Sequence, residues 1–171
     1  MHIKVDDLSG KEIRQLLWLH LSNLSSISPP ESMHALDLDA LRKPSITFWS
    51  VWSDFQSGES SQLMGCGALM ELDSEHAEVK SMRTAPEHLR KGVASELLTH
   101  LVAEARRRGY RRLSLETGAG DAFFPAHHLY TKFGFKPCPP FAGYTDDPNS
   151  RFFSLRLEPD RFAVAADEGR F

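Results

Sequence analysis

The amino-acid sequence predicts one α/β domain, in which helices flank a mixed β-sheet. A β-hairpin rich in aromatic and β-branched residues is predicted at residues 46–73, and the next strand at residues 78–84. An amphipathic helix follows at residues 92–109, and a further strand at residues 112–116. A hairpin followed by a strand–helix–strand unit favours one sheet that mixes both strand directions. The length of 171 residues is sufficient for one hydrophobic core.

The composition is that of an ordinary globular domain and argues against several classes of protein. Hydrophobic residues make up 41% of the chain and charged residues 25%; 20 Lys and Arg against 23 Asp and Glu give a net charge of -3. This balance argues against a nucleic acid or an anionic membrane as a partner. No apolar run is long enough for a membrane helix or a signal peptide, so we expect a cytoplasmic protein.

Neither a disulfide framework nor a metal site is expected. Cys66 and Cys138 are too few for such a framework and too far apart for a zinc knuckle. The 8 histidines show no metal-ligand spacing, and His127 and His128 are adjacent, so they cannot share one helix face. We therefore expect no metal.

The N-terminal part is expected to contain a short strand at residues 2–6 and then a helix. Ser9 is a candidate N-cap for this helix, and Glu12 three residues later completes a capping box. A Pro-containing loop follows at residues 28–37, and a short helix is predicted at residues 37–43.

The C-terminal part is predicted to add one helix and two strands. The helix lies within residues 121–133, and the strands lie at residues 135–138 and 151–157. Periodicity is lost from Pro159 onwards. Residues 1–158 are therefore predicted to form a single domain, and residues 159–171 a flexible tail.

The turn that leads into the long helix has the features of an anion site. A strand ends at Thr84, the helix begins near Gly92, and the residues between them offer no good cap for the first turn. Arg90 and Lys91 place two cations where the helix dipole is already positive. A bound phosphate or pyrophosphate would neutralise them and accept hydrogen bonds from the free N–H groups. The alternative is an ordinary surface turn, since the segment contains neither a P-loop nor a G-x-G-x-x-G motif.

Residues 89–94 and 126–135 resemble two motifs of the GNAT superfamily of N-acetyltransferases, which use acetyl-coenzyme A (acetyl-CoA). Four further stretches are similar to an uncharacterised, small bacterial-type branch of that superfamily: residues 28–37 (SPPESMHALD), 78–86 (EVKSMRTAP), 114–118 (SLETG) and 147–153 (DPNSRFF). Residues 89–94 (LRKGVA) resemble the pyrophosphate motif, which is Gln or Arg, two residues, Gly, one residue, then Gly or Ala. Residues 126–135 (AHHLYTKFGF) resemble the signature A-x-x-L-Y-x-x-x-G-F. The chain departs from the family at Leu89, where Gln or Arg is usual, and at Phe123, where many members have Asn.

The resemblance covers residues 2–157 and implies the GNAT fold, with a twisted mixed sheet of six or seven strands and about four helices. It also implies acetyl-CoA as co-substrate. Tyr130 matches the tyrosine that protonates the departing thiolate, and Glu78, fourteen residues before Gly92, matches the general base of histone-acetylating members. Residues implied to bind the pantetheine arm through their backbone are Met82, Arg83 and Thr84, and those implied to bind the pyrophosphate are Leu89, Arg90, Lys91, Gly92, Val93, Ala94 and Ser95.

The candidate catalytic side chains also have plainer interpretations. Tyr130 could be a core aromatic residue, and Glu78 could form a solvent-facing pair with Lys80 on an alternating strand. Glu116 ends a strand before a Gly-rich segment, and it is a rival for the base or an amine-binding carboxylate.

The predicted reaction is transfer of the acetyl group to a primary amine of a small molecule or an amino acid, by direct attack in a ternary complex. Glu31 and His34 lie in the loop that covers the acceptor site in this fold, so they are candidate substrate contacts, or simply members of a solvated loop. The alternative function is a non-catalytic acyl-CoA-binding sensor or interaction module. A nucleic-acid role for residues 106–112 would need more positive charge. The sequence leaves the oligomeric state open, a homodimer included.

Overall fold

The structure, a computed structural model, describes residues 1–54 and 60–158. Within these ranges seven strands form one sheet in the order β1-β2-β3-β4-β5-β7-β6. All neighbouring strands are antiparallel except β4 and β5, which are parallel, so the predicted mixed sheet of six or seven strands is confirmed. The strands are β1 (His2–Val5), β2 (Ile46–Trp52), β3 (Leu63–Glu71), β4 (His76–Thr84), β5 (Arg112–Gly118), β6 (Lys136–Pro137) and β7 (Ser150–Arg156).

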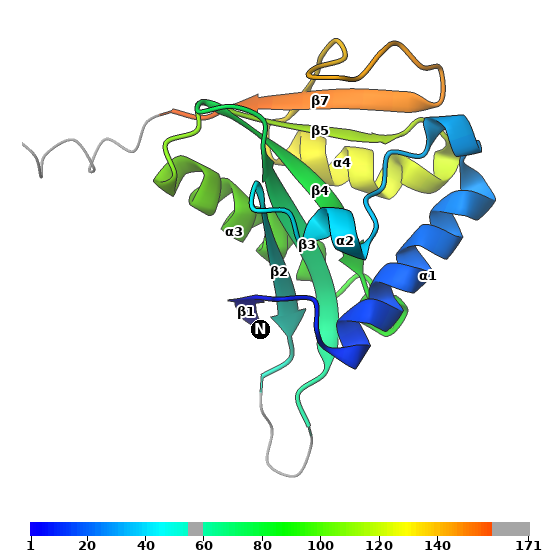
Figure 1. Cartoon of the computed structure of the whole chain (residues 1–171), viewed down its shortest axis with the longest axis vertical. Helices are drawn as coiled ribbons and strands as arrows, with labels where there is room; N and C mark the ends of the chain where they lie inside the picture. Colours follow the sequence, from blue (N-terminus) through cyan, green and yellow to red (C-terminus); the bar gives the residue numbers. More distant parts are fainter. Residues whose placement is uncertain (55–59, 159–171) are drawn as a thin grey trace, which may run out of the picture.

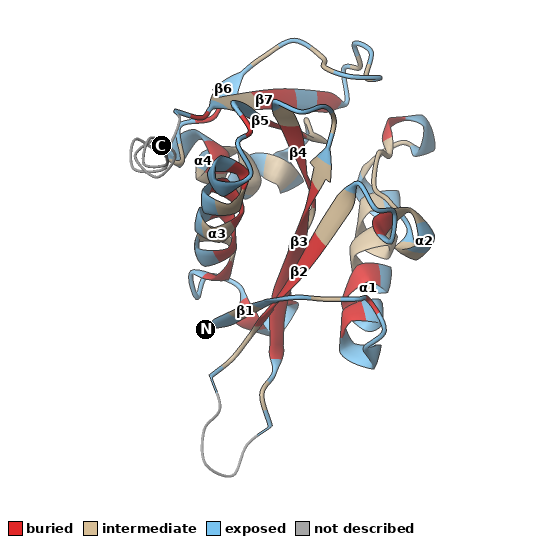
Figure 2. Ribbon diagram, turned by 60° about the vertical axis from the view of Figure 1, so that its left-hand side comes forward, coloured by how far each residue is buried: buried red, intermediate tan, exposed pale blue. Residues whose placement is uncertain are grey.

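Helices cover both faces of this sheet, with α1 and α2 on one face and α3 and α4 on the other (Figure 2). The helices are α1 (Lys11–Ile27), α2 (Leu38–Leu41), α3 (Val93–Arg107) and α4 (Phe124–Lys132). The second is shorter than predicted, and Asp37 caps it by accepting a hydrogen bond from the Ala40 N–H at 2.8 Å.

The first helix corrects one detail of the sequence analysis. Its N-cap is Gly10, which has no side-chain cap, and the predicted capping box of Ser9 and Glu12 is wrong. The reason lies in the preceding turn, where the carboxylates of Asp6 and Asp7 accept the N–H groups of Leu8 and Ser9 at 2.8 and 2.9 Å. These local hydrogen bonds hold Ser9 outside the helix.

The core lies on both sides of the sheet. On one side, Leu97, Leu98 and Leu101 of α3 are fully buried, as the predicted apolar stripe requires. On the other side, Ile13 and Leu17 of α1 pack in a second cluster with residues of β2 and β3. Both helical layers are therefore fixed against the sheet.

The sheet is open where β4 and β5 separate. These strands pair only from His76–Arg112 to Glu78–Ser114, and beyond this point they diverge (Figure 1). A β-bulge also occurs in β4, because Cys66 pairs with Arg83 and Ala68 with Lys80, so one residue of β3 faces two of β4. Ser81 within the bulge has a φ of 53°. The fork leaves one edge of β4 without a strand partner among the described residues.

The predicted tail at residues 159–171 lies outside the described residues, as do residues 55–59 of the loop between β2 and β3. In the described part of the chain, no helix combines the length and the apolar character needed to cross a bilayer.

Candidate active site

A cleft of about 680 Å³ fills the fork between β4 and β5. Its walls come from α1, the loop before α2, the second half of β4, the start of α3, the end of β5 and α4. Most of the predicted site residues line it: His34, Met82, Arg83, Thr84, Leu89, Arg90, Gly92, Val93, Ala94, Ser95, Glu116 and Tyr130. Three predicted residues, Glu31, Glu78 and Lys91, do not.

The start of α3 forms one end of this cleft. Gly92 is the N-cap with a φ of 83°, and no side chain caps the helix. Arg90, two residues earlier, also has a left-handed φ of 59°. Left-handed residues at alternate positions turn backbone N–H groups toward a shared point, and the helix dipole adds positive potential there. The geometry therefore suits an anionic group, as the sequence predicted for this turn.

Tyr130 of α4 reaches across the cleft toward β4. Its hydroxyl oxygen lies 3.9 Å from the Met82 sulfur, and its ring packs edge-on against Phe135 with the ring centres 5.7 Å apart. Burial raises the pKa of the Tyr130 phenol to about 12. The side chain is thus both a core aromatic residue and a cleft residue, and its hydroxyl keeps its proton at neutral pH.

Glu116 lies on the other arm of the fork, near the end of β5. One carboxylate oxygen accepts a hydrogen bond from the Ser150 hydroxyl at 2.7 Å. Burial raises the pKa of this carboxyl group above its ordinary value, and the Ser150 hydrogen bond and the nearby His34 and Lys80 oppose the rise. A carboxylate with a raised pKa in a cleft is suited to accepting a proton.

Glu78, predicted as the base, is placed outside the cleft. It is 1% exposed, and its Oε1 accepts hydrogen bonds from Lys80 Nζ at 3.1 Å and from the Tyr144 hydroxyl at 2.6 Å. The cause is the register, because Glu78 and Ser114 are the last residues that pair before β4 and β5 separate. The pair with Lys80 is therefore buried and structural in character, and it does not face solvent.

This buried pair also holds the loop before α2 in place. Lys80 Nζ donates to the His34 carbonyl oxygen at 3.1 Å, and the His34 ring packs edge-on against Tyr144, with ring centres 5.0 Å apart. His34 thereby reaches the cleft wall, whereas Glu31 is exposed and outside it. Sequence reasoning missed Tyr144, which is 64 residues from Lys80 and carries no motif.

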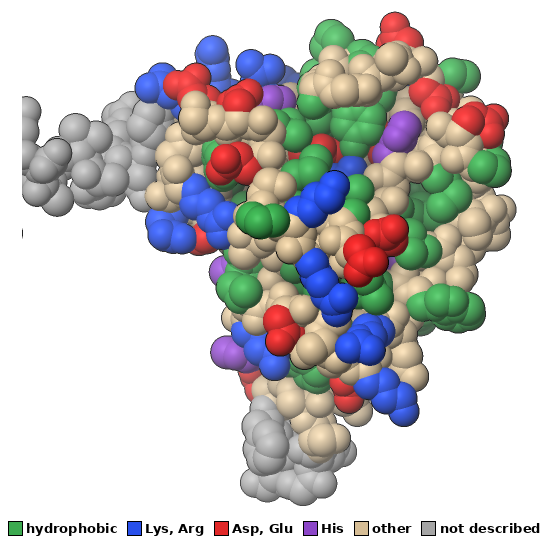
Figure 3. Space-filling view, in the orientation of Figure 1, with side chains coloured by type: hydrophobic (Ala, Val, Ile, Leu, Met, Phe, Trp, Pro, Cys, Tyr) green, Lys and Arg blue, Asp and Glu red, His purple; other side chains and the backbone are tan. Residues whose placement is uncertain are grey.

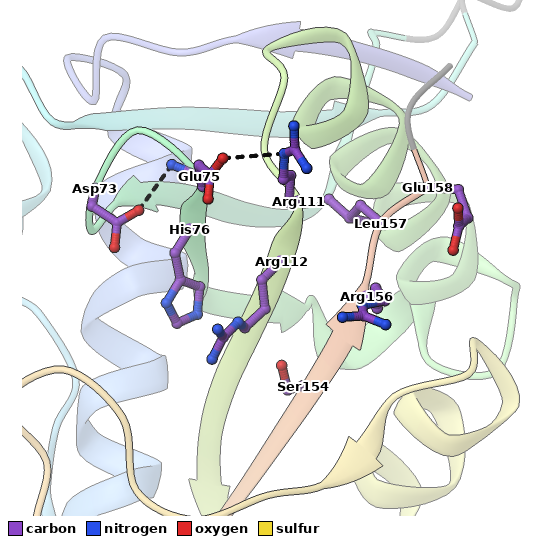
Figure 4. Close-up of a pocket in the computed structure, with 9 residues that line it drawn as sticks. All are labelled: Asp73, Glu75, His76, Arg111, Arg112, Ser154, Arg156, Leu157 and Glu158. Carbon is purple, nitrogen blue, oxygen red and sulfur yellow. Dashed lines mark hydrogen bonds and ion pairs between the residues drawn. The ribbon is translucent and has the colours of Figure 1, made fainter. Parts of the chain in front are cut away.

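A second pocket, of about 600 Å³, lies at the opposite end of β4 and β5 (Figure 4). Its lining includes three arginines, Arg111, Arg112 and Arg156, and three acids, Asp73, Glu75 and Glu158. Their charges balance, and Arg111 pairs with Glu75 at 3.1 Å. On the molecular face drawn in Figure 3, charges of both signs are likewise interspersed. Among the described residues, no three His, Cys, Asp or Glu side chains group as metal ligands.

Comparison with known proteins decides the family. The model described as "Acetyltransferase (GNAT) family" matches residues 11–135, which is more than half of the chain. This chain belongs to the GNAT acetyltransferase family. YsnE of Bacillus subtilis (strain 168), described as an uncharacterized N-acetyltransferase, is 55% identical over 157 residues, covering 92% of this chain and 100% of YsnE.

Solved structures share the fold of this GNAT protein. A structure assigned as an acyl-CoA N-acyltransferase from Klebsiella pneumoniae has a TM-score of 0.72 and 24% identity, covering 92% of this chain and 97% of that one. A GNAT acetyltransferase from Elizabethkingia anophelis, solved with acetyl-CoA bound, has a TM-score of 0.61 and 16% identity, covering 91% and 97%. The predicted GNAT fold is confirmed, and the protein is an acyltransferase.

Proposed function

We propose that this GNAT protein transfers the acetyl group of acetyl-CoA to a primary amine of a small molecule or an amino acid. The observation that carries the proposal is the convergence of three features on one cleft. These are the left-handed turn at Gly92, the open edge of β4, and the side chains of Tyr130 and Glu116 on its walls. Each feature supplies one requirement of the reaction: anion binding, thioester alignment and proton transfer.

The residues present suit acetyl-CoA. Its pyrophosphate would lie against the first-turn N–H groups of α3, where Arg90 adds a charge from the cleft wall. Its pantetheine arm would lie along Met82, Arg83 and Thr84, on the edge of β4 that the fork leaves open, and pair with the backbone as an added strand would. Lys91 is exposed and not part of the cleft wall, so we assign it at most a long-range charge effect.

The chemistry needs a proton acceptor, an oxyanion donor and a proton donor. In the proposal Glu116, not Glu78, accepts the proton of the attacking amine, directly or through water, because only Glu116 lines the cleft. The Met82 N–H in the bulge stabilises the oxyanion of the thioester carbonyl. Tyr130 donates its proton to the departing thiolate. No covalent enzyme intermediate is involved, since the amine attacks the thioester directly.

The test of this function begins with thermal unfolding with and without acetyl-CoA, followed by thiol release with a panel of amines. A ligand held at about 100 times its dissociation constant should stabilise the protein by ~2.7 kcal/mol. We expect a higher melting temperature and thiol release that depends on the amine. Stabilisation with no thiol release on any amine would favour the alternative of a non-catalytic acyl-CoA sensor, and no stabilisation would contradict both.

We expect Gly92→Ala to weaken acetyl-CoA binding as well as stability. A Cβ at Gly92 meets no atom within 4 Å, so the cost arises from the φ of 83°, which is about 1–2 kcal/mol for a residue other than Gly. The strained turn should then move its N–H groups away from the anion and raise the KM for acetyl-CoA.

Gly109→Ala is the matched control for this change. Gly109 follows the other end of α3 with a φ of 84° and equally open surroundings, but it is not part of the cleft. Its melting temperature should fall by a similar amount while the KM for acetyl-CoA stays at the wild-type value. Equal changes in KM for the two variants would show that Gly92 has no special place in the anion site.

A further inference from the structure

The side chain of Arg83 projects to the side of the sheet opposite α3. Arg83 pairs with Cys66 across β3 and β4, and residues paired across strands project from the same face. Cys66 belongs to the cluster under α1, whereas a Cβ at Gly65, the partner of Thr84, would meet Val93 of α3. The backbone of Arg83 therefore lies at the edge of the fork, while its guanidinium group lines the α1 wall of the cleft.

This guanidinium has no partner among the described residues. None of their hydrogen bonds or ion pairs involves it, and its Nε atom is buried without an acceptor. Two titratable groups that feel its charge are neutral at pH 7, since burial and Arg83 lower the pKa of His20 to about 4, and burial raises the pKa of Cys66 to about 12. The carboxylate of Asp6, whose charge acts on the same Cys66, accepts hydrogen bonds from the Ser50 hydroxyl at 2.7 Å and the Leu8 N–H at 2.8 Å.

An arginine keeps its charge at neutral pH, so this partly buried guanidinium, which has no partner among the described residues, favours an anionic ligand. The pyrophosphate of acetyl-CoA does not satisfy it in the proposed binding mode, because that group lies at the start of α3 on the other face of β4. We therefore assign the anion to the acceptor. A single guanidinium balances a monoanion, and its two parallel N–H groups match the two oxygens of a carboxylate. A neutral histidine in the same wall adds one further hydrogen-bonding group: the Nδ1 of His20 is also buried without a partner.

We propose that Arg83, assisted by His20, binds the carboxylate of the acceptor, and that the acceptor is a free amino acid or a related amino-carboxylate. The inference rests on the proposed function and names the substrate class of the same cleft. Glu116 lines the same cleft as Arg83, so in this proposal the amine faces Glu116 and the carboxylate faces Arg83. Leu24, Ile27 and Met33 line the cleft near α1 and offer apolar contacts to the acceptor side chain.

The kinetic test compares amino acids with their amides, such as phenylalanine with phenylalaninamide and leucine with leucinamide. The amide keeps the attacking amine and removes the carboxylate, so the ratio of kcat/KM for acid over amide, corrected for the pKa of each amine, reports carboxylate recognition. We expect the wild-type ratio to exceed one, and Arg83→Gln to lower it by about 10- to 100-fold, the range for loss of a charged hydrogen bond. Arg83→Lys keeps the charge but loses the paired N–H groups, so its acid-to-amide ratio should lie between those of the wild type and Arg83→Gln.

Arg90→Gln is the matched control, since Arg90 lines the same cleft at the start of α3. We expect Arg90→Gln to raise the KM for acetyl-CoA and leave the acid-to-amide ratio at its wild-type value. Arg83→Gln should fold with a melting temperature close to that of the wild type, because the guanidinium makes no hydrogen bond or ion pair with the described residues that the change would remove. A marked loss of stability in Arg83→Gln would reveal a structural partner for Arg83 and overturn the proposal.

A binding measurement separates this inference from the proposed reaction, because it needs no turnover. Calorimetry on the CoA-saturated protein would compare N-acetylphenylalanine and N-acetylleucine with their amides. Tighter binding of the acids that is lost in Arg83→Gln supports the carboxylate site even if no amine is acetylated. Acetylation of amines with no preference for acids, in turnover or in binding, would leave the proposed function standing and overturn this inference.

Discussion

Tyr130→Phe is expected to lower kcat by about 100-fold, while the melting temperature stays close to that of the wild type. General acid catalysis contributes roughly 10²–10⁴-fold, and a thiolate is already a tolerable leaving group, so we expect the lower part of this range. Phenylalanine keeps the buried ring, and the lost hydroxyl contacts only the Met82 sulfur, at 3.9 Å, among the described residues. The measurement is steady-state thiol release at saturating acetyl-CoA and amine.

Tyr110→Phe is the control for a buried tyrosine outside the cleft. Its hydroxyl donates to Glu71 at 2.7 Å, so its removal should cost about 1 kcal/mol of stability and leave kcat unchanged. If Tyr130→Phe loses no more activity than Tyr110→Phe, Tyr130 is only a core aromatic residue and the assignment of the acid fails.

Glu116→Gln is expected to lower kcat/KM by about 100-fold or more and to alter the pH profile. The carboxyl group must be ionised to accept a proton, and burial raises its pKa in the folded protein. The wild-type rate should therefore fall with decreasing pH through a value above the ordinary ~4.3 of glutamate. The Gln variant should lack this acidic limb.

Stability gives an independent check on Glu116. Because its pKa is raised on folding, the ionised carboxylate destabilises the folded state, and this effect is present above the folded pKa and vanishes at acidic pH. Glu116→Gln should then melt at an equal or higher temperature than the wild type near neutral pH, with the difference shrinking in acid. Its amide oxygen can still accept from Ser150.

Glu78→Gln distinguishes the two candidate bases. Neutralising Glu78 weakens its buried contacts with Lys80 and Tyr144, so we expect a large loss of stability. In the protein that remains folded, the fall of kcat/KM with decreasing pH should persist. Loss of that fall in Glu78→Gln, and its retention in Glu116→Gln, would reverse the assignment of the base.

The anion end of the site could be predicted from the sequence because local chemistry determines it. A glycine before a strongly amphipathic helix, without a capping side chain, predicts a turn with free N–H groups, and the structure adds that this turn is left-handed at Gly92. The structure has this turn at Gly92, with α3 beginning at Val93. The same reasoning failed at Ser9, where the competing carboxylates of Asp6 and Asp7 occupy the turn and exclude the capping box.

The acceptor end could not be predicted in the same way, because it depends on where two strands separate. Counting residues from Gly92 selects Glu78, but no sequence pattern states that β4 and β5 stay paired as far as Glu78 and Ser114. The sequence offers Glu116 as a rival because it ends a strand, and the register places it beyond the last pair of β4 and β5. The contact of Tyr144 with Glu78 spans 66 residues, which no local pattern reveals. The bulge in β4 decides which face of the sheet Arg83 projects from, and the bulge is visible only in the folded structure.

The central claim is direct transfer of an acetyl group to an amine in this cleft. The most direct measurement is to supply acetyl-CoA with a labelled acetyl group, together with an accepted amine, and to follow the label by mass spectrometry. The account predicts one labelled acetyl group on the amine nitrogen for each thiol released, and none on the protein. Label recovered as free acetate, or attached to the protein while the amine stays unmodified, would contradict it.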